Sequence, residues 1–387
     1  MITREEATLR KLISIDSTFP NEAKIASFIA AHLRDNGFAV TKQHIGNNRY
    51  NVFAQKGSGK SPIMFYGHMD TVPVYGKWNG SPWVPRKSNG RLYGLGSCDM
   101  KAGVAAAIEA AKSSKDANVK LLFCSDEENI SKGAWAAVGR MRPWFKGVRL
   151  VVSGEPGANM KHVGGANIIT AGRRGRVVFG IDVYGLSSHG AMPKKGLSAL
   201  DAAARLAVHM PRMPMVSGRV GTESLFVREF RSKSSAVSVP ESAYLEIDMH
   251  TVPPTTIASA KKRIEGYAKK LQASGAIDRR VRIKVNLKKR ETRYMQPYQV
   301  DTSSKEFKAV LDSVSAVAGK PQISYGRSVA DDNVFANELN IPVVVVGPRW
   351  GNEHSANEWV SINSYMQIID IYRRLIDHQL FRPNASP

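Results

Sequence analysis

Four short apolar segments, each followed by a metal-seeking side chain, constrain the fold of this chain more than any other feature. The segments cover residues 62–66, 119–125, 148–153 and 341–347. Helices are predicted before and between them, for example at 22–36 and 100–111. Strands of this kind that alternate with helices predict a doubly wound α/β architecture, in which ligands bind at the carboxyl ends of the strands.

Imidazole and carboxylate side chains follow these segments. They are His68, Glu128, Glu155 and His354. A further acid, Asp99, lies in a glycine-bearing turn before the helix at 100–111. Asp99 has two interpretations, a helix N-cap or a metal ligand, because Asp is among the preferred caps. The three adjacent acids at 126–128 repel one another unless a cation or a proton separates them. Together these side chains predict a metal site at one edge of the sheet.

The predicted donor set contains two imidazoles and several carboxylates, and it needs neither of the two cysteines. Nitrogen and oxygen ligands of this kind suit Zn²⁺, Co²⁺ or Mn²⁺, and the number of acids favours two ions that share a carboxylate. Two such ions polarise a carbonyl and activate water at neutral pH. The donor set therefore indicates hydrolytic chemistry.

Five segments of the sequence resemble motifs of the M20 metallopeptidases. They cover residues 67–73, 93–103, 125–128, 153–156 and 354–358. The closest branch is that of acetylornithine deacetylase and succinyl-diaminopimelate desuccinylase. The resemblance implies a homodimeric hydrolase with two Zn²⁺ ions per chain. His68 and Glu155 would bind one ion, Glu128 and His354 the other, and Asp99 would bridge them.

The same resemblance implies roles for three residues that do not bind metal. Glu127 would be the general base, which takes a proton from a metal-bound water and passes it to the leaving amine. Asp70 would accept the second ring N–H of His68 and so fix that imidazole. His189, within the segment at 187–193, would reach the partner subunit's site and stabilise the oxyanion.

The periodicity of the chain changes at about residue 173. Alternating segments at 177–183, 245–249 and 281–287 enclose predicted helices at 199–209 and 256–274, which together predict a four-stranded antiparallel sheet with two helices. We therefore expect a catalytic domain at 1–172 and 291–387. An inserted α+β, ferredoxin-like domain at 173–290 would be the dimerisation lid. The last predicted helix covers 362–380.

Two departures from the family pattern concern substrate binding. Relatives usually carry an Asn before a Val-Pro pair in the lid and an Arg in the strand that follows. Here the matching stretch reads Ala236-Val237-Ser238-Val239-Pro240, so the Asn is absent, and His250 replaces the Arg. A neutral imidazole cannot form the bidentate contact that a guanidinium makes with a carboxylate. The candidate replacements are Arg173, Arg174, Arg327 and Arg349.

The chain carries 55 Lys and Arg against 33 Asp and Glu, a net charge of +22. The basic residues are scattered in small groups without interleaved aromatics, so nucleic-acid binding is not expected. Steering of anionic substrates, or docking of an acidic carrier protein, fits the charge better. Two cysteines, no export signal and no apolar run of about 20 residues predict a cytoplasmic protein.

We expect a metal-dependent amidohydrolase that cleaves an N-acyl amino acid. N-acetylornithine, N-acetyllysine and N-succinyl-diaminopimelate are the first candidate substrates. A dipeptidase or carboxypeptidase would use the same chemistry, and a hydrolase that releases an amino acid from an acidic carrier protein is a further alternative. A binding protein that has lost catalysis is disfavoured, because Glu127 and all five predicted ligands are present.

Overall fold

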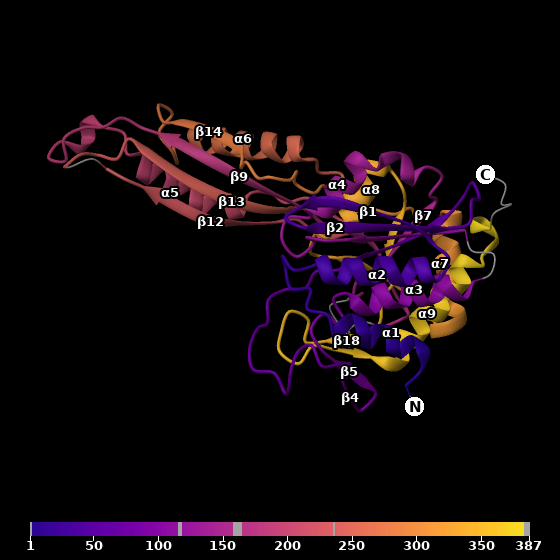
Figure 1. Ribbon diagram of the computed structural model, residues 1–387. Coiled ribbons are helices and arrows are strands. Elements are labelled where there is room, and N and C mark those ends of the chain that lie inside the picture. The colour runs from indigo at the N-terminus through magenta and orange to yellow at the C-terminus, as the bar shows by residue number, and fades with distance from the viewer. Residues whose placement is uncertain (1, 115–117, 158–164, 235–236, 383–387) are drawn as a thin grey trace. The chain divides into compact units, whose positions relative to one another are not determined.

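The computed structural model describes residues 2–114, 118–157, 165–234 and 237–382. Contacts between Cα atoms divide the chain into two compact units (Figure 1). Unit 1 comprises Met1–Gly172, Gln299–Gly326 and Ala330–Pro387, and unit 2 comprises Arg173–Tyr298 and Arg327–Val329. Each unit has its own sheet.

Unit 1 is built around a mixed sheet. Its strands lie in the order β1 (Ala39–Gly46), β2 (Arg49–Lys56), β6 (Val119–Cys124), β3 (Ile63–His68), β7 (Leu150–Ser153), β17 (Val343–Val345), β8 (Ile168–Arg173) and β15 (Tyr298–Gln299), and β16 (Gln322–Gly326) pairs with β8. The central strands β6, β3, β7 and β17 are mutually parallel, whereas β1, β2 and β8 join antiparallel. Every residue of β3 is buried, as expected for a parallel strand covered on both faces.

Helices cover both faces of this sheet. They are α1 (Arg4–Ile13), α2 (Ala23–Asp35), α3 (Lys101–Ser113), α4 (Lys132–Arg140), α7 (Lys305–Ala318), α8 (Asp332–Leu339) and α9 (Ile362–Ile376). Figure 1 shows α2 and α3 on one face and α4 and α8 on the other. A small sheet of β4 (Arg86–Ser88), β5 (Arg91–Tyr93), β18 (Trp350–Gly351) and β19 (Trp359–Ser361) completes the unit. The doubly wound arrangement expected from the sequence is confirmed.

Glycine allows α3 to lie directly against the turn that follows β7. A Cβ atom on Gly103 would lie 2.2 Å from the carbonyl oxygen of Gly154, so a larger residue would separate the two segments. The contact joins the start of α3, which follows Asp99, to the turn that carries Glu155. Two of the predicted metal ligands are thereby held on adjoining segments.

Unit 2 contains a four-stranded antiparallel sheet in the order β12 (Ser224–Ser232), β13 (Ser242–Thr251), β9 (Gly175–Tyr184) and β14 (Arg282–Leu287). The helices α5 (Ala199–His209) and α6 (Ile257–Ala273) share a hydrophobic core with its strands. The hairpin of β10 (Ser217–Gly218) and β11 (Gly221–Thr222) precedes β12. The sheet and both helices were expected from the sequence, although β12 was not located.

Two boundaries differ from those expected. The last helix ends at Ile376 and not at residue 380, because the side chain of His378 accepts the N–H of Leu380 and starts a separate 3₁₀ turn at Gln379–Phe381. Residues 291–298 stay with unit 2, where the N–H of Arg176 donates to the carbonyl oxygen of Met295 at 2.9 Å. The chain therefore returns to unit 1 at Gln299.

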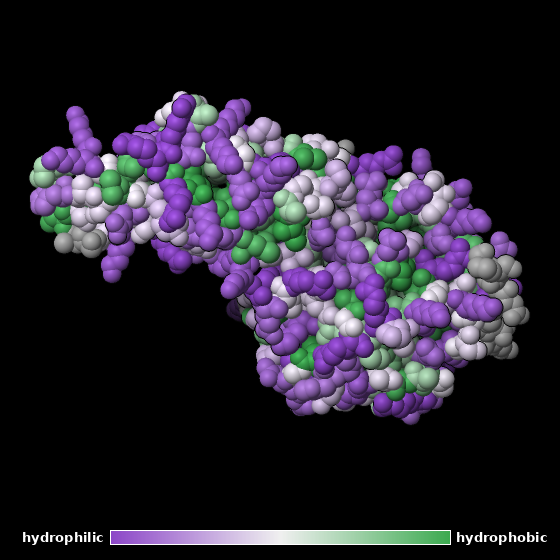
Figure 2. Space-filling model, turned by 90° about the horizontal axis from the view of Figure 1, so that it is seen from above, coloured by the Kyte–Doolittle hydropathy of each residue, from purple (hydrophilic) through white to green (hydrophobic). Residues whose placement is uncertain are grey.

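The surface is largely polar, and its charge is unevenly distributed. Hydrophilic side chains cover most of the face in Figure 2, between small apolar patches. Residues 173–298 hold 24 of the 55 basic residues but only 10 of the 33 acidic ones. Most of the excess positive charge thus belongs to unit 2. Among the described residues, no helix has the length and apolar character needed to cross a bilayer.

Candidate metal centre

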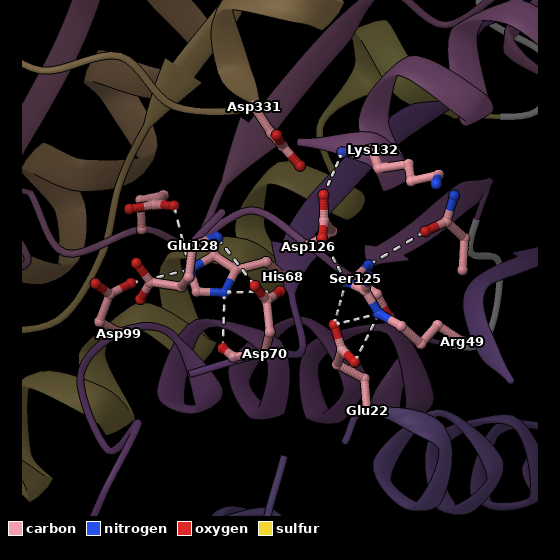
Figure 3. Close-up of polar contacts among 12 residues, drawn as sticks. Glu22, Arg49, His68, Asp70, Asp99, Ser125, Asp126, Glu128, Lys132 and Asp331 are labelled. Atoms are coloured by element: carbon pink, nitrogen blue, oxygen red, sulfur yellow. Dashed lines mark hydrogen bonds and ion pairs between the residues drawn. The ribbon is translucent and has the colours of Figure 1, made fainter. Parts of the chain in front are cut away.

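Neighbouring parallel strands bring the predicted ligands to one edge of the unit 1 sheet (Figure 3). His68 is the last residue of β3 and pairs with Cys124 at the end of β6, so the acids at 126–128 follow directly beside it. On the other side of β3, Tyr66 pairs with Ser153 at the end of β7, two residues before Glu155. The register of three strands therefore clusters these side chains.

Asp99 lies between two groups of ligands. Its Oδ1 is 2.9 Å from Nε2 of His68, and its Oδ2 is 2.9 Å from Nε2 of His354. Glu155 approaches the first imidazole at 3.5 Å, and Glu128 approaches the second at 3.1 Å. Each carboxylate oxygen of Asp99 thus serves a different imidazole, which is the geometry expected of a bridging ligand.

The alternative interpretation of Asp99 as a helix cap is wrong. The helix α3 begins at Lys101, its N-cap position is Met100, and no side chain caps it. The carboxylate of Asp99 is instead directed to the two histidines.

Asp70 does not contact His68 in the expected way. Nδ1 of His68 lies 3.0 Å from the main-chain oxygen of Asp70 and 3.7 Å from its carboxylate. The other carboxylate oxygen, Oδ2, accepts the N–H of Glu128 at 2.9 Å. A proton on Nδ1 of His68 can be donated to this carbonyl oxygen, which leaves Nε2 to face Asp99 and Glu155.

This arrangement places hydrogen-bond acceptors against one another, which requires a shared proton or a cation between them. Burial opposes ionisation of Asp99, but hydrogen bonds to His354 and His68 hold the pKa of Asp99 well below its usual range. Contacts with Asp99 and Glu128 raise the pKa of His354 to about 11. A divalent cation would stabilise the same carboxylates. Ligand atoms of His68, Asp99 and Glu128 lie within 4.8 Å of one another, as do those of Asp99, Glu353 and His354, and imidazole nitrogens with carboxylate oxygens are a donor set that suits such a cation.

Glu127 lies on the side of His68 and Glu155, with ligand atoms of all three residues within 4.8 Å of one another. Burial and the nearby charge of Glu155 raise the pKa of Glu127 well above its usual range. A carboxyl group with a raised pKa is suited to proton transfer near neutral pH. Its neighbour Glu128 turns to His354 instead.

Glu358 received no role from the sequence, yet it fixes the turn that carries Asp99. Its buried carboxylate accepts N–H groups from Gly96 at 2.8 Å, Cys98 at 2.7 Å and Asp99 at 3.2 Å. Burial raises the pKa of Glu358 to about 7. Because all three donors are main-chain groups, no pattern of side chains in the sequence pointed to this contact.

The remaining predicted residues lie in unit 2, apart from Arg349. His189 is exposed, and its Nδ1 accepts the N–H of Ala191 at 3.1 Å. Arg173 is nearly buried, with Nη1 at 3.5 Å from the hydroxyl of Ser328. Burial and the charge of Arg327 lower the pKa of Arg174.

His250 belongs to the same part of unit 2. Burial lowers its pKa, and the charges of Arg176 and Arg174 lower it further. The charge of Arg327 thus acts on Arg174 and the charge of Arg174 acts on His250, whereas Arg349 belongs to unit 1. Ala236, the first residue of the stretch that lacks the expected Asn, lies outside the described residues.

Comparison with known proteins agrees with this geometry. Residues 64–378 match the model of peptidase family M20/M25/M40. A succinyl-diaminopimelate desuccinylase of Sulfurimonas denitrificans is 26% identical over 379 residues, covering 95% of this chain and 97% of that protein. A desuccinylase of the same name from Buchnera aphidicola is also 26% identical, over 95% of this chain and 96% of the relative.

Solved structures share the fold along nearly the whole chain. The aminopeptidase PepT of Bacillus cereus matches with a TM-score of 0.76 at 18% identity, over 97% of both chains. The YXEP protein of Bacillus subtilis, described as a dinuclear metal binding peptidase from the M20 family, matches with a TM-score of 0.70 at 14% identity, over 96% of both chains. The chain belongs to the M20/M25/M40 peptidase family and is a metal-dependent hydrolase of C–N bonds.

Proposed function

We propose that the protein is a dinuclear zinc amidohydrolase that converts an N-acyl amino acid to a carboxylate and a free amine. The observation that carries this proposal is the position of Asp99, whose two oxygens contact two different histidines at 2.9 Å. In the proposed site His68 and Glu155 hold one ion, and Glu128 and His354 hold the other. The ions would supply Lewis acidity, which polarises the scissile carbonyl and lowers the pKa of water.

Glu127 is proposed to move the protons of the reaction. It accepts a proton from the attacking water as the new C–O bond forms, and it gives that proton to the amine nitrogen as the C–N bond breaks. Burial beside Glu155 raises the pKa of Glu127, which supports both halves of this transfer.

His189 is proposed to donate a hydrogen bond to the oxyanion in the site of a partner subunit. Since Nδ1 accepts the N–H of Ala191, the neutral ring carries its proton on Nε2 and presents it as a donor. The side chain is exposed on unit 2, so it is accessible for such a role. This proposal implies a homodimer.

Mixing two inactive variants tests the proposed exchange between subunits. His189→Ala and Glu127→Gln homodimers should each be nearly inactive, whereas their heterodimer should regain activity. One of its two sites combines an intact Glu127 with an intact His189 from the other chain, and the second site carries both defects. Heterodimers isolated by two affinity tags, with kcat no higher than that of either parent, would show that His189 does not act across the subunits.

The substrate is proposed to be anionic. The relatives named desuccinylases suggest N-succinyl-diaminopimelate first, and the positive charge of unit 2 would attract such a molecule. Arg174, whose pKa is lowered by burial and by the charge of Arg327, and Arg327 itself are the proposed partners of a substrate carboxylate. Both cysteines are free thiols, in keeping with a cytoplasmic enzyme.

A panel of substrates tests the proposed activity. The zinc-loaded protein is incubated with N-succinyl-diaminopimelate, N-acetylornithine, N-acetyllysine and dipeptides, and the released amine is measured. We expect turnover of an N-acyl amino acid, with weaker activity on dipeptides. Preferential cleavage of dipeptides would contradict the proposal and indicate a peptidase. Activity only on an amino acid bound to an acidic carrier protein, lost at high salt, would indicate the carrier-dependent alternative.

A further inference from the structure

A buried ion cluster lies beside the candidate metal centre without belonging to it. Arg49 at the start of β2 donates to both oxygens of Glu22 at 2.7–3.1 Å and to Oδ1 of Asp126 at 2.6 Å (Figure 3). Arg49 is 5% exposed, and both acids are fully buried. Among the described residues, neither acid belongs to a group able to hold a metal.

Asp126 closes the loop that carries Glu127 and Glu128. Its main-chain oxygen accepts the N–H of Ser131 at 2.7 Å, and its Oδ2 accepts the N–H of Lys132 at 2.8 Å. Asp126 also has a φ of +80°, a conformation that is costly for a residue with a side chain and needs support from its surroundings. Its remaining oxygen is held by Arg49.

The other side of Arg49 is connected to the turn after His68. The guanidinium lies over the ring of Phe19, 4.6 Å from its centroid, and the N–H of Phe19 donates to the carbonyl oxygen of Thr71 at 3.1 Å. Thr71 follows Asp70, whose carboxylate in turn accepts the N–H of Glu128. Arg49 therefore connects the segments that carry His68 and Glu127.

We propose that Arg49, oriented by Glu22, is a positioning residue that holds the Asp126 loop so that Glu127 faces the reacting water and Glu128 faces the metal. The proposal rests on the role given to Glu127 under the proposed function. A guanidinium is required because its planar fork bonds two carboxylates in a fixed geometry, whereas an ammonium is a point charge on a flexible chain.

The first test is Arg49→Lys, which keeps the charge but not the fork. Displacement of a reacting group by about 1 Å costs roughly 100-fold in rate. We expect kcat to fall roughly 10- to 100-fold with little change in KM. Zn²⁺ affinity, measured by competition with a chelator on the folded protein, should also fall as Glu128 loses its orientation. A folded Arg49→Lys variant with wild-type kcat and zinc affinity would overturn the proposal.

A second variant separates positioning from the burial of charge. The triple variant Glu22→Gln, Arg49→Met, Asp126→Asn removes all three charges together, so no buried ion is left unpaired and the fold should survive. Circular dichroism should then be unchanged while kcat and zinc affinity stay low. Wild-type kcat in the folded triple variant would mean that the cluster only compensates charge. If the triple variant does not fold, the kinetics of Arg49→Lys decide.

The matched control is Arg149→Met. Arg149 donates to Glu306 at 2.6 Å and 3.0 Å. It directly precedes β7, at the end of the sheet opposite the metal centre. The Arg149→Met variant should therefore change stability but not kcat. Glu127→Gln is measured alongside. If Glu127→Gln keeps full activity, the proposed function fails. If Glu127→Gln is inactive but Arg49→Lys is normal, only the positioning role fails.

Discussion

Replacing Glu127 with Gln should lower kcat by roughly 10²- to 10⁴-fold, the usual contribution of one general acid-base group. The amide keeps the shape of the side chain but cannot accept a proton from water. Because the metals are assigned to other residues, Zn²⁺ content should remain at the wild-type value. Steady-state kinetics and metal analysis of the same preparation test both parts of this prediction.

Glu306→Gln is a suitable control for that experiment. Glu306 is also a carboxylate of unit 1 bonded by a neighbouring side chain, but it pairs with Arg149 and not with the site residues. It should retain wild-type kcat. Full metal occupancy together with wild-type turnover in Glu127→Gln would show that another group takes the proton.

Asp99→Asn should lose bound metal while keeping the fold. A neutral amide is a poor bridge between two cations. Substitution of a residue that only orients a metal ligand lowers metal affinity roughly 10- to 100-fold, and substitution of the ligand Asp99 itself should lower it more. The fold should survive because Asp99 does not cap α3. Zinc per chain after gel filtration and the thermal unfolding curve measure these two quantities.

Asp370→Asn provides the comparison for Asp99→Asn. Asp370 lies on α9, its side chain is 54% exposed, and it forms an ion pair with Arg373 at 3.1 Å. Its substitution should leave two ions bound. If Asp99→Asn binds two zinc ions with wild-type affinity, Asp99 does not bridge them.

The sequence predicts the central strands and the position of the site because both depend on local patterns. The short apolar segments of β3 and β6 predict buried strands, and His68 is the last residue of β3 while Glu128 lies four residues after the end of β6. The carboxyl ends of neighbouring parallel strands lie at the same edge of the sheet, so these residues are expected to lie close together. The alternation along β9 and β13 likewise predicts the antiparallel sheet of unit 2.

The contacts that orient the site depend on partners distant in sequence or on main-chain atoms, so the sequence does not reveal them. The main-chain carbonyl of Asp70 lies closer to His68 than its carboxylate does, and Oδ2 of that carboxylate accepts the N–H of Glu128. Glu358 acts only through main-chain donors. The partners of Asp126 include Arg49, 77 residues away. A bulge between Val227 and Glu229 breaks the alternation that would have marked β12.

Anomalous diffraction from crystals of the zinc-loaded protein tests the central claim most directly. We predict two zinc peaks per chain, about 3.5–4 Å apart, with the carboxylate of Asp99 between them. One peak should contact His68 and Glu155, and the other should contact His354 and Glu128. A single peak, or two peaks that do not share Asp99, would contradict the account.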